Sequence, residues 1–224
     1  DFIFYRPPGL TADLRVTKDD IPEELIKRTK VLVVTGTGLS ANPSYEANVH
    51  AVKIARKYGK TVVFNLDWRP TLWRNVPEEE RLRRYAEVIS MSNIIIGGVP
   101  EWLAATGKNS IMDALNYVRS INNNIIGAIV TKGEEGVTAY WEGKEINVKP
   151  IKVYVLKTLG AGDAFLAAFL YGYLYLSKLG WNIEKILEFA NAAAAIVVTR
   201  HSCSEAMPTY DEVMLFLNEM REKV

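Results

Sequence analysis

The residues best suited to chemistry lie at 155–165, which read Val-Leu-Lys-Thr-Leu-Gly-Ala-Gly-Asp-Ala-Phe. We expect a strand to end here, a turn to form at Gly160, Ala161 and Gly162, and a long helix to begin at about Asp163. Glycines let the backbone turn sharply and bring successive N–H groups close to an anion, and a helix N-terminus adds unpaired N–H donors. Such a turn is suited to binding a phosphoryl group during its transfer. Asp163 would stay ionised and accept a proton from an attacking hydroxyl.

This glycine turn differs from two other glycine motifs. No Lys-Ser or Lys-Thr pair follows it, so it is not a Walker A loop. Phe165 stands where the dinucleotide-binding fingerprint needs a third glycine. The structural alternative is an ordinary strand-to-helix turn in which Asp163 only caps the helix.

A second glycine-rich segment, Thr-Lys-Gly-Glu-Glu-Gly at residues 131–136, follows a predicted strand. Its backbone could approach the phosphates of a nucleotide at Thr131, Gly133 and Gly136, because glycine leaves room for close contact. Many ordinary β-turns have a similar sequence, so the segment alone leaves both interpretations open.

Short β-branched runs alternate with helical patterns, which predicts an α/β fold with a mostly parallel sheet covered on both faces. No internal repeat, low-complexity tract or interdomain linker is visible, so we expect one domain over residues 1–224. The expected strands are 31–34, 61–66, 94–96, 125–131, 137–141 and 145–148. One helix is expected to begin at Pro43 after an Asn42 cap, and two more are expected at 78–91 and 110–121. From Gly162 the chain is expected to be helical almost to its end, with breaks near Gly180 and at 202–208. Thr209 then opens the last helix.

The composition excludes several classes of protein. The net charge is only +1, which gives no general attraction to nucleic acid or to an anionic membrane, and no apolar run is long enough to span a bilayer. One cysteine, Cys203, excludes an intrachain disulfide, and with His50 and His201 it is too little for a zinc site. We therefore expect a cytoplasmic protein. Residues 2–6 read as a strand already under way with no preceding Met, which predicts that the chain begins inside a longer protein.

Gly-Ala-Gly-Asp at the start of a long apolar helix resembles the C-terminal signature of the PfkB, or ribokinase-like, carbohydrate kinases, and the resemblance covers nearly the whole chain. Lys157, Thr158 and the stretch 193–209 are similar to the branch that phosphorylates 5-dehydro-2-deoxygluconate in inositol catabolism. The resemblance implies a three-layer α/β/α fold with a mostly parallel central sheet, lacking the family's N-terminal part and lid. It also implies that the missing part is supplied elsewhere, or that a homodimer forms.

In that resemblance, Asp163 is the catalytic base, and the amides of Gly160, Ala161 and Gly162 form the anion hole. ATP with Mg²⁺ is the implied donor. The segment 131–136 looks like the family's nucleotide loop, which implies that Thr131, Gly133 and Gly136 contact ATP. Asn191, in a later helix, is an implied contact on the adenosine side.

The resemblance also implies residues for the sugar. Asp67, Arg69 and the following proline look like the family's substrate-binding segment, and Arg6 belongs to a strand that reaches the substrate. Glu101 matches an acidic residue that acts through water on Mg²⁺ and phosphate. The alternatives are an Asp67–Arg69 salt bridge, an exposed edge-strand arginine at position 6, and a helix-stabilising carboxylate at Glu101.

The expected function is ATP-dependent phosphorylation of a sugar or keto-deoxy sugar acid hydroxyl, with 5-dehydro-2-deoxy-D-gluconate as the implied substrate. Alternative substrates are 2-keto-3-deoxygluconate and fructose. A non-catalytic module that senses a nucleotide or a sugar is an alternative of a different class. A small-molecule sugar is the expected partner, with no nucleic acid and no membrane.

Overall fold

Five-residue runs rich in β-branched residues form the strands in the computed structural model, which describes residues 11–222. The chain divides into two compact units. Unit 1 holds the residues up to Val130 together with Tyr140–Glu142, and unit 2 holds Thr131–Ala139 and the residues from Gly143 onward. The predicted strand at residues 2–6, including Arg6, lies outside the described residues.

The strands of unit 1 lie side by side in the order β1-β2-β3-β4. The pairs β1–β2 and β2–β3 are parallel, with Val33 opposite Val63 and Val63 opposite Ile94. Parallel strands buried between other layers are rich in apolar residues, as the largely buried β2 and β3 are. The strands are β1 (Val31–Thr35), β2 (Thr61–Asn65), β3 (Ile94–Gly98) and β4 (Gly127–Thr131), whose last residue is counted in unit 2.

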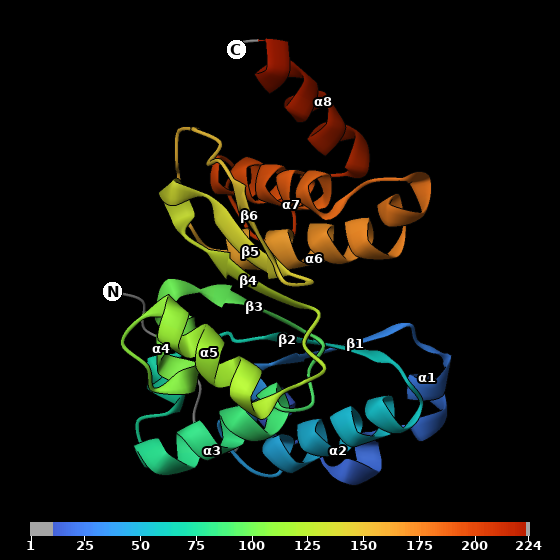
Figure 1. Ribbon diagram of the computed structural model, residues 1–224, viewed down its shortest axis with the longest axis vertical. Helices are drawn as coiled ribbons and strands as arrows, with labels where there is room; N and C mark the ends of the chain where they lie inside the picture. Colours follow the sequence, from blue (N-terminus) through green and yellow to red (C-terminus); the bar gives the residue numbers. More distant parts are fainter. Residues whose placement is uncertain (1–10, 223–224) are drawn as a thin grey trace. The chain divides into compact units, whose positions relative to one another are not determined.

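Helices connect these strands. Because parallel strands in sequential order need right-handed crossovers, the connecting helices are expected on one face of the sheet. Figure 1 shows α2 and α3 side by side, and α2 contacts both β1 and β2. The buried side chains of Phe64, Tyr85 and Trp102 belong to the core between strands and helices. The helices are α1 (Glu23–Arg28), α2 (Ser44–Lys57), α3 (Glu78–Ile89), α4 (Val99–Thr106) and α5 (Ile111–Ile121).

Unit 2 combines most of a hairpin, whose residues Tyr140–Glu142 are counted in unit 1, with three helices. The strands β5 (Val137–Trp141) and β6 (Lys144–Val148) flank a two-residue turn with positive φ at Glu142 and Gly143, typical of a type I′ hairpin. Figure 1 shows α6 and α7 lying against each other, and α8 contacts α7. The helices are α6 (Ala161–Leu174), α7 (Ile183–Val198) and α8 (Tyr210–Glu222). Short 3₁₀ turns in the described chain are Ala12–Leu14, Lys18–Asp20, Gly36–Leu39, Pro70–Leu72, Gly133–Glu135 and Leu176–Leu179.

Three local predictions were wrong. No strand precedes the glycine turn: the N–H groups of Leu156 and Lys157 donate to the Val198 carbonyl instead of to a neighbouring strand. Helix α6 begins at Ala161, two residues before the expected start. Helix α2 begins at Ser44, so Pro43 is its N-cap and not its first residue.

The α/β class and the parallel pairing are confirmed by the strands of unit 1. The single domain remains a prediction. None of the helices within residues 11–222 combines the length and the apolar character needed to cross a bilayer.

Candidate functional site

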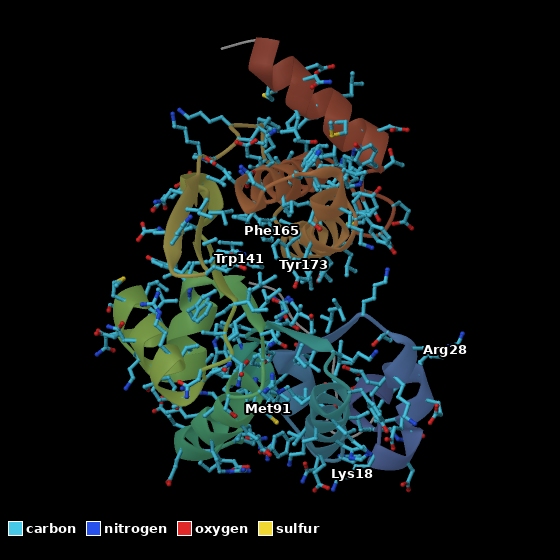
Figure 2. All side chains as sticks on the ribbon, turned by 45° about the vertical axis from the view of Figure 1, so that its right-hand side comes forward. Lys18, Arg28, Met91, Trp141, Phe165 and Tyr173 are labelled. Atoms are coloured by element: carbon cyan, nitrogen blue, oxygen red, sulfur yellow. The ribbon has the colours of Figure 1, made fainter. Side chains whose placement is uncertain are left out.

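A cavity of about 780 Å³ in unit 2 brings the two glycine-rich segments together. Its size is within the usual range for small-molecule sites. Phe165 of α6, labelled in Figure 2, is 2% exposed and forms part of the wall. The lining residues are Thr131, Gly133, Glu134, Gly136, Val137, Pro150, Ile151, Lys152, Val153, Val155, Thr158, Ala161, Gly162, Phe165, Asn191, Ala194, Ala195 and Val198.

The turn at residues 131–136 is closed by a 2.8 Å hydrogen bond from Lys132 N–H to the Gly136 carbonyl. Gly136 has φ 90° and ψ −141°, a conformation that side chains rarely adopt. A Cβ at this position would lie 2.2 Å from the Val148 carbonyl oxygen, so another backbone segment occupies the space. The glycine at 136 is therefore required by the fold itself, whether or not a ligand binds.

The start of α6 presents unpaired backbone donors beside the cavity. Gly160 is the N-cap, in the left-handed region with φ 90°, and its carbonyl accepts the first helical bond, from Ala164 N–H. The N–H of Ala161 donates to the Thr158 carbonyl at 3.3 Å. Within the described chain, the N–H groups of Gly162 and Asp163 have no backbone acceptor. This part of the helix can therefore donate to an anion.

The carboxylate of Asp163 does not cap α6. Its side chain is exposed, and within residues 11–222 it makes no hydrogen bond or ion pair. The structural alternative, in which Asp163 is needed as a cap, has no supporting contact. The carboxylate is free to accept a proton from a bound hydroxyl.

Gly162 differs from Gly136 in what its surroundings require. Its φ is not positive, and a Cβ added there would meet nothing within 4 Å. The fold therefore accepts alanine at this position. A residue without a side chain leaves room here for a ligand to approach the helix N-terminus closely.

One wall of the cavity is apolar and was missed by sequence reasoning. Ala194, Ala195 and Val198 of α7 share a helix face with Asn191, whose side-chain amide donates to the Lys149 carbonyl at 3.0 Å. The spacing of these four residues, at i, i+3, i+4 and i+7, is the signal that could have identified the face. An apolar wall with one amide is suited to a flat heterocyclic base.

The sugar-side candidates of the sequence lie in unit 1, after β2. Asp67 has φ 36°, an uncommon value for a residue other than glycine. Its carboxylate accepts a hydrogen bond from the Thr37 hydroxyl and pairs with the Arg69 guanidinium at 3.0 Å. The predicted salt-bridge alternative is thus present. Because the Arg69 side chain is 44% exposed, its remaining donors are open to a ligand.

Glu101 connects the segments that follow β2 and β3. One carboxylate oxygen accepts from Gly98 N–H at 2.6 Å, and the other accepts from Trp68 N–H at 3.1 Å. Gly98 has no side chain, so the contact with it is half of a capping box. Burial raises the pKa of Glu101, the Gly98 N–H opposes this effect, and the nearby Asp67 carboxylate adds to it. Glu101 is therefore held in place as a structural carboxylate.

Whether this part of the chain could hold a magnesium ion depends on its carboxylates, among them Asp67 and Glu101. Among residues 11–222, no group of three or more His, Cys, Asp or Glu side chains is arranged to hold a metal. Mg²⁺ commonly keeps several waters and binds through one or two carboxylates together with phosphate oxygens. Glu101 fits only such a water-mediated role, because both its oxygens already accept backbone N–H groups.

Comparison with known proteins agrees with this architecture. Residues 1–210 match the model of the pfkB family carbohydrate kinases. The chain is 38% identical over 218 residues to the 5-dehydro-2-deoxygluconokinase of Clostridium beijerinckii, a match that covers 95% of this chain and 62% of that protein. The chain thus spans less than two thirds of the length of this relative.

Two solved structures are similar in fold. The fructokinase with bound ATP from Xylella fastidiosa has a TM-score of 0.86 at 23% identity, covering 99% of this chain and 70% of that one. The aminoimidazole riboside kinase from Salmonella enterica, complexed with aminoimidazole riboside and an ATP analog, has a TM-score of 0.78 at 26% identity, covering 92% and 68%. These matches confirm the predicted ribokinase-like fold. With the family model matching residues 1–210, the chain belongs to the pfkB family of carbohydrate kinases.

Proposed function

We propose that this chain is the nucleotide-binding, catalytic part of an ATP-dependent carbohydrate kinase. The observation that carries the proposal is that the turn at 131–136 and the start of α6 line the same cavity. The apolar wall would bind the adenine ring, with Asn191 beside it. Thr131, Gly133 and Gly136 would contact the phosphates, and the terminal phosphate would lie at the start of α6.

Asp163 would be the general base of the transfer. Its carboxylate takes the proton from a sugar hydroxyl, the hydroxyl oxygen forms a bond to the γ-phosphorus, and the bond to the β-phosphate oxygen breaks to release ADP. The N–H groups of Gly160, Gly162 and Asp163 would stabilise the charge on the transferred group. The N–H of Ala161 already donates to the Thr158 carbonyl, so Ala161 would help to shape the turn and would not bind the phosphoryl group directly.

Magnesium bound with the nucleotide would neutralise phosphate charge. Glu101 would contribute to holding it only through water, since the carboxylate is occupied by Gly98 and Trp68 N–H groups. Its larger contribution would be to hold the segment that carries Asp67 and Arg69.

We propose 5-dehydro-2-deoxy-D-gluconate as the sugar substrate. The proposal is supported by the 38% identical relative of that name and by the exposed Arg69 guanidinium, a planar group that can pair with a substrate carboxylate. Asp67 would orient Arg69 through the ion pair of 3.0 Å. Arg6, which lies outside the described residues, stays a second candidate for the same contact.

We also propose that the two units belong to one kinase domain, because the family match at residues 1–210 extends over both. Separate domains would give two unfolding transitions. One cooperative transition, with the same midpoint for probes in each unit, would support a single domain.

The test of the function combines turnover with direct binding. In the full-length protein, ATP consumption is measured with 5-dehydro-2-deoxygluconate, 2-keto-3-deoxygluconate and fructose, and binding of ADP and of a non-hydrolysable ATP analogue is measured by calorimetry. Gly162→Ala is expected to weaken binding of the ATP analogue about tenfold or more, equivalent to about 1.4 kcal/mol, while the melting temperature does not fall.

Three results would contradict parts of the proposal. Binding of the ATP analogue that is unaffected by Gly162→Ala would mean that the terminal phosphate does not lie at the start of α6. Binding of ADP without turnover of any sugar would favour the non-catalytic sensing module. Preference for fructose or 2-keto-3-deoxygluconate would keep the kinase and change its substrate.

A further inference from the structure

Lys157 comes shortly before the glycine turn in the chain and does not line the cavity. It is half-buried. Its ammonium group donates a hydrogen bond of 2.7 Å to the carbonyl oxygen of Leu159. The thiol of Cys203 lies 3.8 Å from the same carbonyl oxygen and 3.8 Å from the Lys157 nitrogen. The Leu159 carbonyl is therefore held on the side of the turn where Lys157 and Cys203 lie.

The direction of this carbonyl determines the direction of the next N–H. The C=O of Leu159 and the N–H of Gly160 belong to one planar trans peptide, in which the two bonds point in opposite directions. A carbonyl directed at Lys157 therefore directs the Gly160 N–H away from Lys157. Rotation of this peptide would exchange the two directions and place a carbonyl oxygen where the N–H had been.

The chain at Gly160 does not by itself prevent such a rotation. Glycine accepts positive and negative φ about equally, so the observed φ of 90° is not enforced by a side chain. Lys157 is well placed to supply the restraint. Its backbone N–H donates to the Val198 carbonyl at 3.2 Å, so both the base and the tip of the residue are fixed.

We infer that Lys157 is a positioning residue that orients the Leu159–Gly160 peptide so that the Gly160 N–H faces the transferred phosphoryl group. The inference rests on the proposed kinase function. Lys157 acts through the Leu159 carbonyl and does not contact the phosphate. A residue that only stabilised the fold would affect unfolding and not the chemical step.

The first test compares Lys157→Met, Lys157→Arg and the wild type in the full-length protein. Removal of one oxyanion-hole donor typically lowers kcat about 10²–10³-fold, so a misdirected donor in Lys157→Met should lower kcat at least about tenfold. The KM for ATP and the melting temperature should stay near wild-type values, and Lys157→Arg should recover part of kcat. Lys185→Met, at an exposed lysine of α7, is the matched control and should leave kcat unchanged.

The second test is chemical rescue. Lys157→Ala leaves a space for a small amine, so methylammonium should restore kcat several-fold, whereas tetramethylammonium, which cannot donate a hydrogen bond, should not. Equal effects of the two ions would show a general salt effect and overturn the inference.

The outcomes separate this inference from the proposed function. A wild-type protein that phosphorylates no sugar contradicts the kinase, whereas an active wild type with an equally active Lys157→Met contradicts only the role of Lys157. A crystal structure of Lys157→Met is independent of activity. If the Leu159–Gly160 peptide keeps its orientation in that variant, the inference is wrong.

Discussion

The backbone N–H of Trp68 donates a hydrogen bond of 3.1 Å to the side-chain carboxylate of Glu101. The second oxygen of that carboxylate accepts from Gly98 N–H at 2.6 Å. One half-buried carboxylate thus fixes the segments that follow two neighbouring strands. Trp68 stands between Asp67 and Arg69, so Glu101 sets the backbone from which both of these side chains extend.

Glu101→Gln should show that the backbone at Trp68 and Gly98 depends on the carboxylate. The amide has one acceptor oxygen, so either Trp68 or Gly98 loses its partner and faces an NH₂ group. A fully buried donor without a partner costs about 1–3 kcal/mol, and partial solvent access at this half-buried site makes the cost smaller here. We expect faster hydrogen exchange at one of these two amides and a lower free energy of unfolding.

Glu79→Gln, at an exposed glutamate in the first turn of α3, is the control and should change stability by less than about 0.5 kcal/mol. Unchanged exchange at both Gly98 and Trp68 in Glu101→Gln would show that the carboxylate does not hold the segment.

Asp163→Asn should separate catalysis from folding. The variant removes the proton acceptor, and a positioned general base typically contributes about 10²–10⁴-fold, so kcat should fall by that order. Because Asp163 makes no capping contact, the melting temperature and ADP affinity should hardly change. Turnover, calorimetry and thermal unfolding on the same full-length variant provide the measurement.

Asp211→Asn is the matched control, because Asp211 is also an exposed first-turn aspartate, in α8. It should leave kcat at the wild-type value. If Asp163→Asn retains turnover within about tenfold of wild type, Asp163 is not the base.

Gly136→Ala should damage the fold, in contrast to Gly162→Ala. An added Cβ would lie 2.2 Å from the Val148 carbonyl oxygen and would need a φ of 90°. Backbone strain of this kind costs about 1–3 kcal/mol, before the steric clash is added. We expect a clearly lower melting temperature for Gly136→Ala, measured by calorimetry. Equal melting temperatures for the two variants would mean that the turn adjusts easily.

Arg69→Ala should affect the sugar and not the nucleotide. The guanidinium is 44% exposed and keeps donors beyond its ion pair with Asp67, so its loss should raise KM for an acidic sugar far more than KM for ATP. Arg74→Ala, at an exposed arginine nearby in the chain, should change neither constant. A parallel rise of both constants in Arg69→Ala would assign the residue to structure.

The stabilisation that Glu212 gives at the start of α8 should depend on pH. The pKa of Glu212 is lowered from 4.5 to about 2, first by the Thr209 N–H and then by the Arg200 side chain. A depressed folded-state pKa gives stability that is complete above the unfolded value and is lost as pH falls. The difference in unfolding free energy between wild type and Glu212→Gln should therefore be constant above about pH 5 and disappear between 4.5 and 2.

A difference for Glu212→Gln that persists at pH 2 would mean that packing, and not the charge, accounts for it.

The sequence by itself determined the α/β class, all six described strands to within two residues at each end, and a glycine turn that leads into a helix at Gly160 to Asp163. These depend on local rules: β-branched runs, helix periodicity, and the donors that a glycine turn and a helix start must present. The helix start predicted at Thr209 also depends on a local pattern, and the structure has both Thr209–Glu212 hydrogen bonds of a capping box there.

Only the tertiary structure decided what lies around these segments. Sequence patterns could not exclude a strand before the glycine turn, because Leu156 and Lys157 bond to Val198, a residue distant in the chain. They could not distinguish the glycine that the fold requires at 136 from the one it does not require at 162, since neighbouring backbone makes that difference. The contacts of Lys157 with Leu159 and of Glu101 with Trp68 likewise depend on where folding places a charged side chain, which no local pattern specifies.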